Sequence, residues 1–173
     1  HMLRHDICEA LKEVMGDRMA NLYYKSDTTL PFKADIEHEN SFIYGGDEND
    51  IAVENGLKFH VDWLRGQKTG FFVDQRENRL LLESYAQNRS VLNMFCYTGC
   101  FSVYAMRGGA NIVHSVDSSA KAIELTNRNV AENFGDDPRH EAICEDAFKF
   151  LDDNDKKYDL IGLDPPAFAK HRA

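Results

Sequence analysis

Apolar and polar positions change their pattern at about Ser90. From there on, short apolar runs alternate with segments of helical period, which is typical of βαβ units and a parallel sheet. The runs predict four strands, over residues 91–95, 112–116, 142–144 and 158–163. Helices are predicted between these strands, over residues 101–106 and 147–151. A further helix is predicted where Ala120, Ile123, Val130 and Phe134 recur at helical spacing. We therefore expect an α/β fold, a Rossmann-like three-layer sandwich around a parallel sheet.

The first fifty residues predict a small α/β appendage. An amphipathic period over Ile7–Met15 indicates a short helix that ends at Gly16, and the apolar stretch 21–25 indicates a strand. Residues 26–50 are mostly polar, which predicts a loop with one edge strand.

A β-hairpin and a linking helix are expected over residues 51–89. Apolar and polar residues alternate on both sides of Asn55-Gly56, a strong indication of a two-residue hairpin turn. Asp74 is the expected N-cap of the helix that follows. The sheet domain then occupies residues 90–173.

The composition allows one sizeable core and excludes some classes of protein. With 173 residues and 43% apolar content, one main domain is expected. No apolar run approaches the roughly 20 residues of a membrane helix. The N-terminus also lacks a signal-peptide pattern, so we expect a cytoplasmic protein without a membrane partner. The net charge of −9 disfavours nucleic-acid binding over a broad surface. The four cysteines lack metal-ligand spacing, which predicts reduced thiols and no metal site.

Polar residues follow each of the four predicted strands. In an open parallel sheet, ligands bind outside the carboxyl ends of the strands, near the point where the strand order reverses. Strand one ends in Asn93-Met94-Phe95-Cys96-Tyr97-Thr98-Gly99, strand two ends in Asp117-Ser118, the third strand runs to Glu145-Asp146, and strand four ends in Asp164. Packing alone does not explain these residues, so we expect one ligand site at this edge.

The spacing of Gly99 and Asp117 indicates a ligand that contains adenosine. Gly99 lacks the Cβ that would block a close approach of a ligand to the backbone. Asp117 comes 18 positions later, where a carboxylate can accept hydrogen bonds from two ribose hydroxyls. A dinucleotide would need three glycines at this turn to receive its pyrophosphate, and only Gly99 is in place. The residues favour S-adenosyl-L-methionine; the alternative is a plain tight turn followed by a capping aspartate.

Asp146 and the segment after Asp164 complete the expected site. Asp146 is placed to receive the adenine amino group, with Ala147 and Phe148 beside the ring, and it can also be the N-cap of a helix. Two prolines after a buried strand fix a rigid turn that presents Asp164, and Phe168 offers a face to a nucleobase. The alternative is a turn that only terminates the strand.

Four segments stand in a fixed order within about residues 50–170: Gly66–Arg76, Val91–Gly99, Val116–Ser119 and Asp164–Phe168. Together they resemble the ribosomal RNA large-subunit cytosine-5 methyltransferase family. The resemblance implies a class I methyltransferase fold and methyl transfer from S-adenosyl-L-methionine to a base of 23S rRNA. It also places Lys68, Thr69, Gln75 and Arg76 near the cofactor or the target. The candidate cofactor-binding residues are Phe95, Cys96, Tyr97, Thr98, Gly99, Asp117, Ser118, Asp146, Ala147, Asp164, Pro165, Gln75 and Arg76, and Asp164 is also the catalytic candidate.

Methylation at carbon 5 of cytosine normally needs a cysteine thiolate that adds to carbon 6. In the family this cysteine lies in a Ser/Thr-Cys-Ser motif on a later strand, and members have a seven-stranded sheet and an N-terminal RNA-binding domain. The resemblance therefore implies a fragment with a truncated sheet, inactive on its own. None of the four cysteines present, Cys96 included, is a good substitute. The fourth strand becomes an open edge through which we expect self-association.

Two other functions remain open. An Asp-Pro-Pro turn followed by an aromatic residue also suits methylation of a base nitrogen of guanine or adenine in RNA, which needs no covalent cysteine. The third hypothesis is that the same residues form a non-catalytic module that binds an adenosine-containing ligand.

Overall fold

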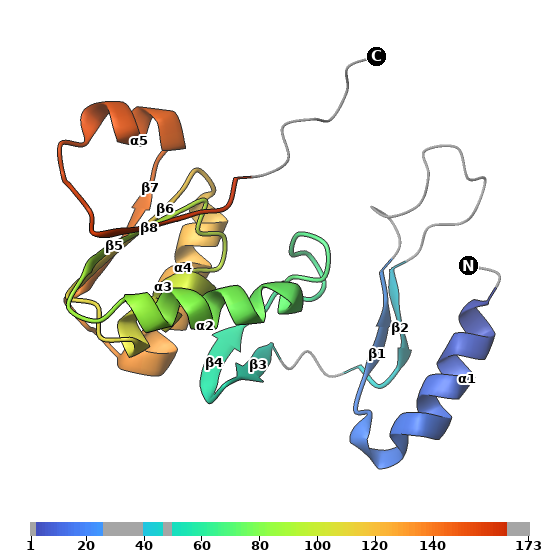
Figure 1. Ribbon diagram of the computed structural model, residues 1–173. Coiled ribbons are helices and arrows are strands. Elements are labelled where there is room, and N and C mark those ends of the chain that lie inside the picture. The colour runs from blue at the N-terminus through green and yellow to red at the C-terminus, as the bar shows by residue number, and fades with distance from the viewer. Residues whose placement is uncertain (1–2, 26–39, 47–49, 166–173) are drawn as a thin grey trace.

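The computed structural model describes residues 3–25, 40–46 and 50–165, and the largest sheet in this part of the chain is a four-stranded parallel sheet (Figure 1). The strands are β5 (Ser90–Met94), β6 (Ile112–Asp117), β7 (His140–Cys144) and β8 (Leu160–Leu163), in the spatial order β7-β6-β5-β8. All neighbouring pairs are parallel. The predicted parallel sheet is confirmed. Because the chain continues from β5 to β6 on one side and returns to β8 on the other, the strand order reverses at β5.

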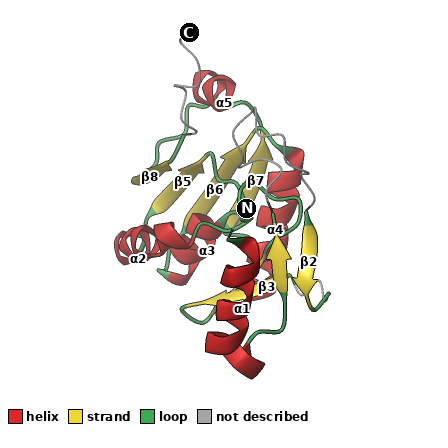
Figure 2. Cartoon of the chain, turned by 90° about the vertical axis from the view of Figure 1, so that its right-hand side faces the viewer, coloured by secondary structure: helices red, strands yellow, loops and turns green. Residues whose placement is uncertain are grey.

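Helices cover both faces of this sheet and give the expected three layers (Figure 2). On one face lie α2 (Arg76–Tyr85), α3 (Cys100–Arg107) and α4 (Ala120–Phe134), and on the other lies α5 (Ala147–Asp153). Successive residues of β5 point to opposite faces: Val91 packs in one cluster with Val103 of α3, whereas Leu92 packs in another with Phe150 of α5. The central strands are therefore buried on both sides, which explains their continuous apolar runs.

The N-terminal part contains α1 (Arg4–Met15), which ends at Gly16 as predicted, and an antiparallel pair of strands. These strands are β1 (Leu22–Tyr24) and β2 (Ser41–Tyr44). Tyr23 packs edge-to-face on Phe42, with ring centroids 5.0 Å apart. No helix in the described part of the chain is both long and apolar enough to span a membrane.

The hairpin expected around Asn55-Gly56 is present as β3 (Ile51–Glu54) and β4 (Leu57–His60). Both turn residues have positive φ, 50° and 80°, as a type I′ turn requires. Asn129 of α4 fixes the hairpin: its Oδ1 accepts from the His60 amide at 2.6 Å, and its Nδ2 donates to the Thr98 carbonyl at 2.7 Å. One buried side chain therefore ties the hairpin to the turn that follows β5.

A buried ion pair joins the hairpin to α2. Arg79 is 2% exposed, and its Nε and Nη2 each donate to a carboxylate oxygen of Glu54 at 2.8 Å. The Tyr104 hydroxyl of α3 donates to the same carboxylate at 2.8 Å. Arg79 Nη1 also donates to the Phe72 carbonyl at 3.0 Å, so this pair fixes the segment that carries Gln75.

Asp74 is not the N-cap of α2, contrary to the prediction. It lies in a 3-10 turn over Val73–Gln75, and α2 begins after this turn without a side-chain cap. The turn is closed by a 3.2 Å backbone hydrogen bond to the Phe72 carbonyl, the group that Arg79 also holds. β5 begins and ends one residue earlier than expected, and it ends at Met94 because Phe95 adopts a left-handed conformation (φ 55°) in which the strand cannot continue.

Candidate functional site

The turn after β5 lies at the carboxyl edge of the sheet and has an unusual backbone. Phe95, Tyr97 and Gly99 all have positive φ, of 55°, 48° and 71°. Neighbouring elements hold this conformation: Thr126 Oγ1 donates to the Tyr97 carbonyl at 3.0 Å, and Asn129 holds the Thr98 carbonyl. Left-handed non-glycine residues are costly and persist only where the surroundings over-determine them. The turn is therefore rigid, and it lies at the point where the strand order reverses.

Gly99 is required here, for a reason that the sequence did not reveal. A Cβ at this position would lie 2.5 Å from the Thr126 side chain, and φ is left-handed. Packing against α4 alone therefore excludes a larger residue. A close approach of ligand to backbone is not needed to explain the glycine.

Asp117, at the end of β6, faces this turn. Its Oδ2 accepts from the Tyr97 amide at 2.9 Å, and its Oδ1 accepts from the Ser119 amide at 2.9 Å. Each carboxylate oxygen has a further lone pair, so the group can still accept two hydroxyl donors. Ser119 is the N-cap of α4, since its Oγ accepts from the Ala122 amide, and Ser118 is exposed beside Asp117. The structure thus brings Asp117 and the glycine turn together, as predicted.

Asp146 follows β7 and caps α5. Its Oδ1 accepts from the amides of Phe148 and Lys149 at 3.0 and 3.1 Å, which confirms the N-cap prediction. Within the described part of the chain, no recorded hydrogen bond uses Oδ2, so this oxygen can accept from a ligand. Phe148 is 66% exposed and Ala147 is half-buried at the same edge. The contact with adenine stays a prediction.

A cavity of about 250 Å³ lies beside β8 and contains two of the predicted residues, Gln75 and Asp164. We name it the β8 cavity; its lining is Gln75, Asn78, Asn93, Phe101, Gly162, Leu163 and Asp164. Arg76 is not part of it and pairs with Glu77 at 3.2 Å on the exposed side of α2. Pro165 is exposed after Asp164, and the predicted segment Pro166–Phe168 lies outside the described residues.

Asn93 belongs to this cavity, although it was not among the candidate residues. It stands inside the apolar run Val-Leu-Asn-Met-Phe and is 3% exposed. A polar residue within a strand that is buried on both faces needs a partner, and that was the available indication.

Tyr97 connects the turn to the loop that carries Lys68 and Thr69. Its hydroxyl accepts from the Gln67 amide at 3.0 Å, and its ring packs edge-to-face on Phe72 at 5.6 Å. Burial raises the pKa of Tyr97. Lys68 and Thr69 are exposed on this loop, so the structure places them near the turn but not in the β8 cavity.

The cysteines at the turn are poor nucleophiles. Burial raises the pKa of Cys96 to about 12 and that of Cys100 to about 11, so both thiols are protonated at neutral pH. Cys144 is exposed at the end of β7, and Cys8 is buried on α1. Among residues 3–25, 40–46 and 50–165, no three His, Cys, Asp or Glu side chains gather as metal ligands would.

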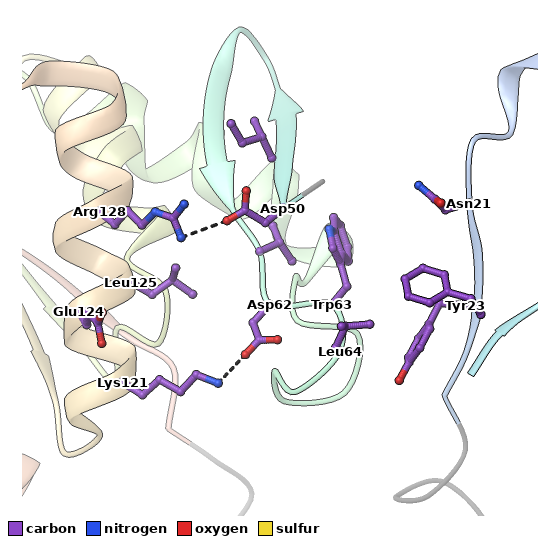
Figure 3. Close-up of a pocket in the computed structure, with 13 residues that line it drawn as sticks. Asn21, Tyr23, Asp50, Asp62, Trp63, Leu64, Lys121, Glu124, Leu125 and Arg128 are labelled. Atoms are coloured by element: carbon purple, nitrogen blue, oxygen red, sulfur yellow. Dashed lines mark hydrogen bonds and ion pairs between the residues drawn. The ribbon is translucent and has the colours of Figure 1, made fainter. Parts of the chain in front are cut away.

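A larger cavity, of about 620 Å³, lies between α4 and the N-terminal strands and was not anticipated (Figure 3). Trp63 and Leu64 lie between α4 on one side and β1 on the other. The two basic side chains that line this cavity each form an ion pair with a carboxylate: Arg128 pairs with Asp50 at 3.0 Å, and Lys121 pairs with Asp62. The full lining is Asn21, Tyr23, Phe42, Asp50, Ile51, Val61, Asp62, Trp63, Leu64, Lys121, Glu124, Leu125 and Arg128. These residues come from separate segments, so no single motif could reveal the cavity.

A family model for S-adenosylmethionine-dependent methyltransferases matches residues 40–172. This chain belongs to that family. Its members use S-adenosylmethionine as the cofactor, which agrees with the ligand inferred from Gly99 and Asp117. The individual residues assigned to the cofactor remain predictions.

Curated relatives carry the name ribosomal RNA large subunit methyltransferase I. The protein of Tolumonas auensis is 40% identical over 176 residues, which cover 98% of this chain and 44% of the relative. That of Alteromonas mediterranea is 38% identical, over 98% of this chain and 43% of the relative. The chain therefore spans less than half the length of these relatives.

Solved structures give the same fold. A protein from Streptococcus mutans, assigned as a SAM-dependent methyltransferase, superposes with a TM-score of 0.80 at 30% identity, over 95% of this chain and 43% of that one. A second structure, assigned as a methyltransferase and complexed with SAH, gives a TM-score of 0.81 at 31% identity, over 98% and 43%. The Rossmann-like three-layer fold expected from the sequence is confirmed.

Proposed function

We propose that this chain forms the cofactor-binding part of a methyltransferase that modifies ribosomal RNA, at carbon 5 of a cytosine in 23S rRNA. The main support is that Asp117, Asp146 and Asp164 stand at or after the ends of three strands of the parallel sheet, at the edge where the rigid turn Phe95–Gly99 lies. Relatives named as rRNA large subunit methyltransferases, at 38–40% identity, support RNA as the substrate.

The residues present fit S-adenosylmethionine, which supplies the methyl group when bound. Asp117 retains lone pairs for the two ribose hydroxyls, and Asp146 Oδ2 can accept from the adenine amino group. Asp164 and Gln75 share the β8 cavity, where both are assigned to the cofactor, and Asp164 is also assigned to the target base. Arg76 and Pro165 are assigned to the rim of this site.

Methylation at carbon 5 of cytosine needs a thiolate nucleophile. Cys96 and Cys100 are protonated and buried, so the proposal assigns this step to a cysteine outside residues 1–173. Within this chain, Asp164 is the residue assigned to contact the base.

Calorimetric titration with S-adenosylmethionine tests the cofactor site. Asp117→Asn keeps an acceptor for the Tyr97 amide but removes the charge, and we expect at least a tenfold loss of affinity. Asp153→Asn, at the end of α5, is the matched control and should bind like the parent. NAD should not bind. Equal affinity of the parent and Asp117→Asn would contradict the assignment.

The target is tested separately, on the natural protein that contains this chain. It is incubated with unmodified 23S rRNA, and the nucleosides are analysed by mass spectrometry. We expect 5-methylcytidine. A methylated guanine or adenine nitrogen would replace cytosine as the target while leaving the cofactor site in place.

A further inference from the structure

A line of polar side chains, three of them buried and His140 partly buried, crosses the sheet on the face covered by α3 and α4. Asn93 Nδ2 donates to Ser102 Oγ at 2.9 Å, Ser102 Oγ lies 2.6 Å from Ser115 Oγ, and Ser115 Oγ lies 2.8 Å from His140 Nε2. Both serines are fully buried. The four residues come from β5, α3, β6 and β7, and we name them the polar relay. The polar relay links the β8 cavity to β7, the strand at the opposite edge of the sheet.

A continuous chain of donors that starts at the amide nitrogen of Asn93 has one direction. The amide nitrogen can only donate, so Ser102 Oγ accepts from it, and the chain continues when Ser102 donates its own single hydrogen to Ser115. Ser115 then has one hydrogen to donate, and His140 Nε2 is the acceptor. This requires a neutral imidazole that carries its proton on Nδ1.

The surroundings of His140 favour this neutral form. Burial, together with the nearby His114 of β6, lowers the pKa of His140 to about 4. Asp137 and Glu141 act in the opposite direction, with smaller effects. The ring is therefore an acceptor at neutral pH, as the direction of the relay demands.

The far end of the relay presents an acceptor to the β8 cavity. With Nδ2 committed to Ser102, Asn93 Oδ1 faces Gly162, 3.8 Å from where a Cβ of that glycine would stand. Across the described residues, no recorded hydrogen bond reaches this oxygen, although Asn93 is 3% exposed. A buried acceptor of this kind is costly unless a ligand donates to it.

We infer that Ser102, Ser115 and His140 are positioning residues that hold Asn93 with Oδ1 toward the β8 cavity, so that this subsite takes an ammonium group. The identity of the ligand rests on the proposed function, because the cofactor and its demethylated product carry an ammonium group on their amino-acid part. A hydrogen-bond donor in place of His140 Nε2 would remove the terminal acceptor of the relay and favour the reverse direction of its bonds. The amide would then turn its NH₂ toward the ligand and repel an ammonium.

The tautomer of His140 tests the relay without any ligand. Long-range ¹H–¹⁵N correlation spectra of the chain at pH 7.5 identify which ring nitrogen is protonated, and His140→Gln assigns the signal by its loss. We expect the proton on Nδ1. A proton on Nε2, or a charged ring, overturns the inference.

Calorimetry with two ligands tests the consequence at the cavity. S-adenosylhomocysteine carries the ammonium group, whereas 5′-methylthioadenosine lacks the amino-acid part. Ser115→Ala and His140→Leu should each lower the affinity for S-adenosylhomocysteine by about tenfold. They should leave the affinity for 5′-methylthioadenosine within about twofold of that of the parent. His140→Gln, which restores an acceptor, should recover most of the affinity.

His114→Leu is the matched control, because His114 is a buried histidine on the neighbouring strand β6 but contacts Tyr158 on the other face of the sheet. It should leave both affinities near those of the parent. Equal losses for the two ligands in His140→Leu would show a general structural effect and overturn the inference. If the parent binds neither ligand, the proposed function fails, while the tautomer still decides whether the relay exists.

Discussion

The buried ion pair between Glu54 and Arg79 leads to a quantitative prediction about stability. Glu54→Gln keeps the shape of the side chain and one carbonyl oxygen, but it removes the charge that two guanidinium nitrogens face at 2.8 Å. Arg79 stays charged and is 2% exposed, so water cannot replace the lost partner. Breaking a buried pair costs about 3–5 kcal/mol. Because glutamine retains one acceptor, we expect about 3 kcal/mol, at the lower end of that range.

Urea unfolding at pH 7, followed by far-ultraviolet circular dichroism, measures this loss. With a slope of about 2 kcal/mol per molar urea, the midpoint should fall by about 1.5 M. Single domains are stable by only about 5–15 kcal/mol, so the change is a large share of the total.

Glu77→Gln is the control, because it removes the same charge from an exposed pair on the same helix. Glu77 pairs with Arg76 at 3.2 Å, and their side chains are 75% and 57% exposed. Exposed pairs contribute little, so the midpoint should not move. Equal shifts for the two variants, or no shift for Glu54→Gln, would refute the reasoning.

Three further predictions concern the sheet and its edge. Gly99→Ala should cost about 2–4 kcal/mol in thermal unfolding, because its Cβ would meet Thr126 at 2.5 Å in a left-handed conformation, and a neutral effect would contradict this. The pKa of His140 falls from 6.5 to about 4 on folding, so stability is full above pH 6.5 and declines by up to about 3 kcal/mol as the pH drops toward 4. His140→Gln should remove that slope in a pH series of urea unfolding, and an unchanged slope would contradict the assignment. We also expect self-association through β8, where Ile161 is 55% exposed. Light scattering should show a mass that rises with concentration and falls in Ile161→Lys; a monodisperse parent would argue against it.

The sequence was sufficient for the sheet because its central strands, β5 and β6, are buried on both faces. That burial leaves continuous apolar runs, and the predicted strands match β5 to β8 within two residues at each end. Turn chemistry was equally readable at Asn55-Gly56 and at the cap Asp146, since each depends on residues close in the sequence.

Contacts between distant segments were beyond reach of the sequence. Glu54 and Arg79 are 25 positions apart, and nothing local indicates that they meet. The 3-10 turn at Asp74 depends on that same pair, which is why the cap prediction failed. Asn93 was visible as a polar residue in an apolar run, but its partners Ser102 and Ser115 are determined by the packing of α3 on the sheet.

Asn129 joins the hairpin to the turn after β5, and hydrogen exchange of the backbone amides can measure this connection. Its amide group holds the His60 amide of the hairpin with one end and the Thr98 carbonyl of the turn with the other. Opening of the hairpin breaks the bond between Asn129 and the His60 amide, and we expect a ligand that binds at the turn to slow exchange of this amide. The hairpin, 69 residues away from Asn129 in the chain, becomes a reporter of what happens at the carboxyl edge of the sheet.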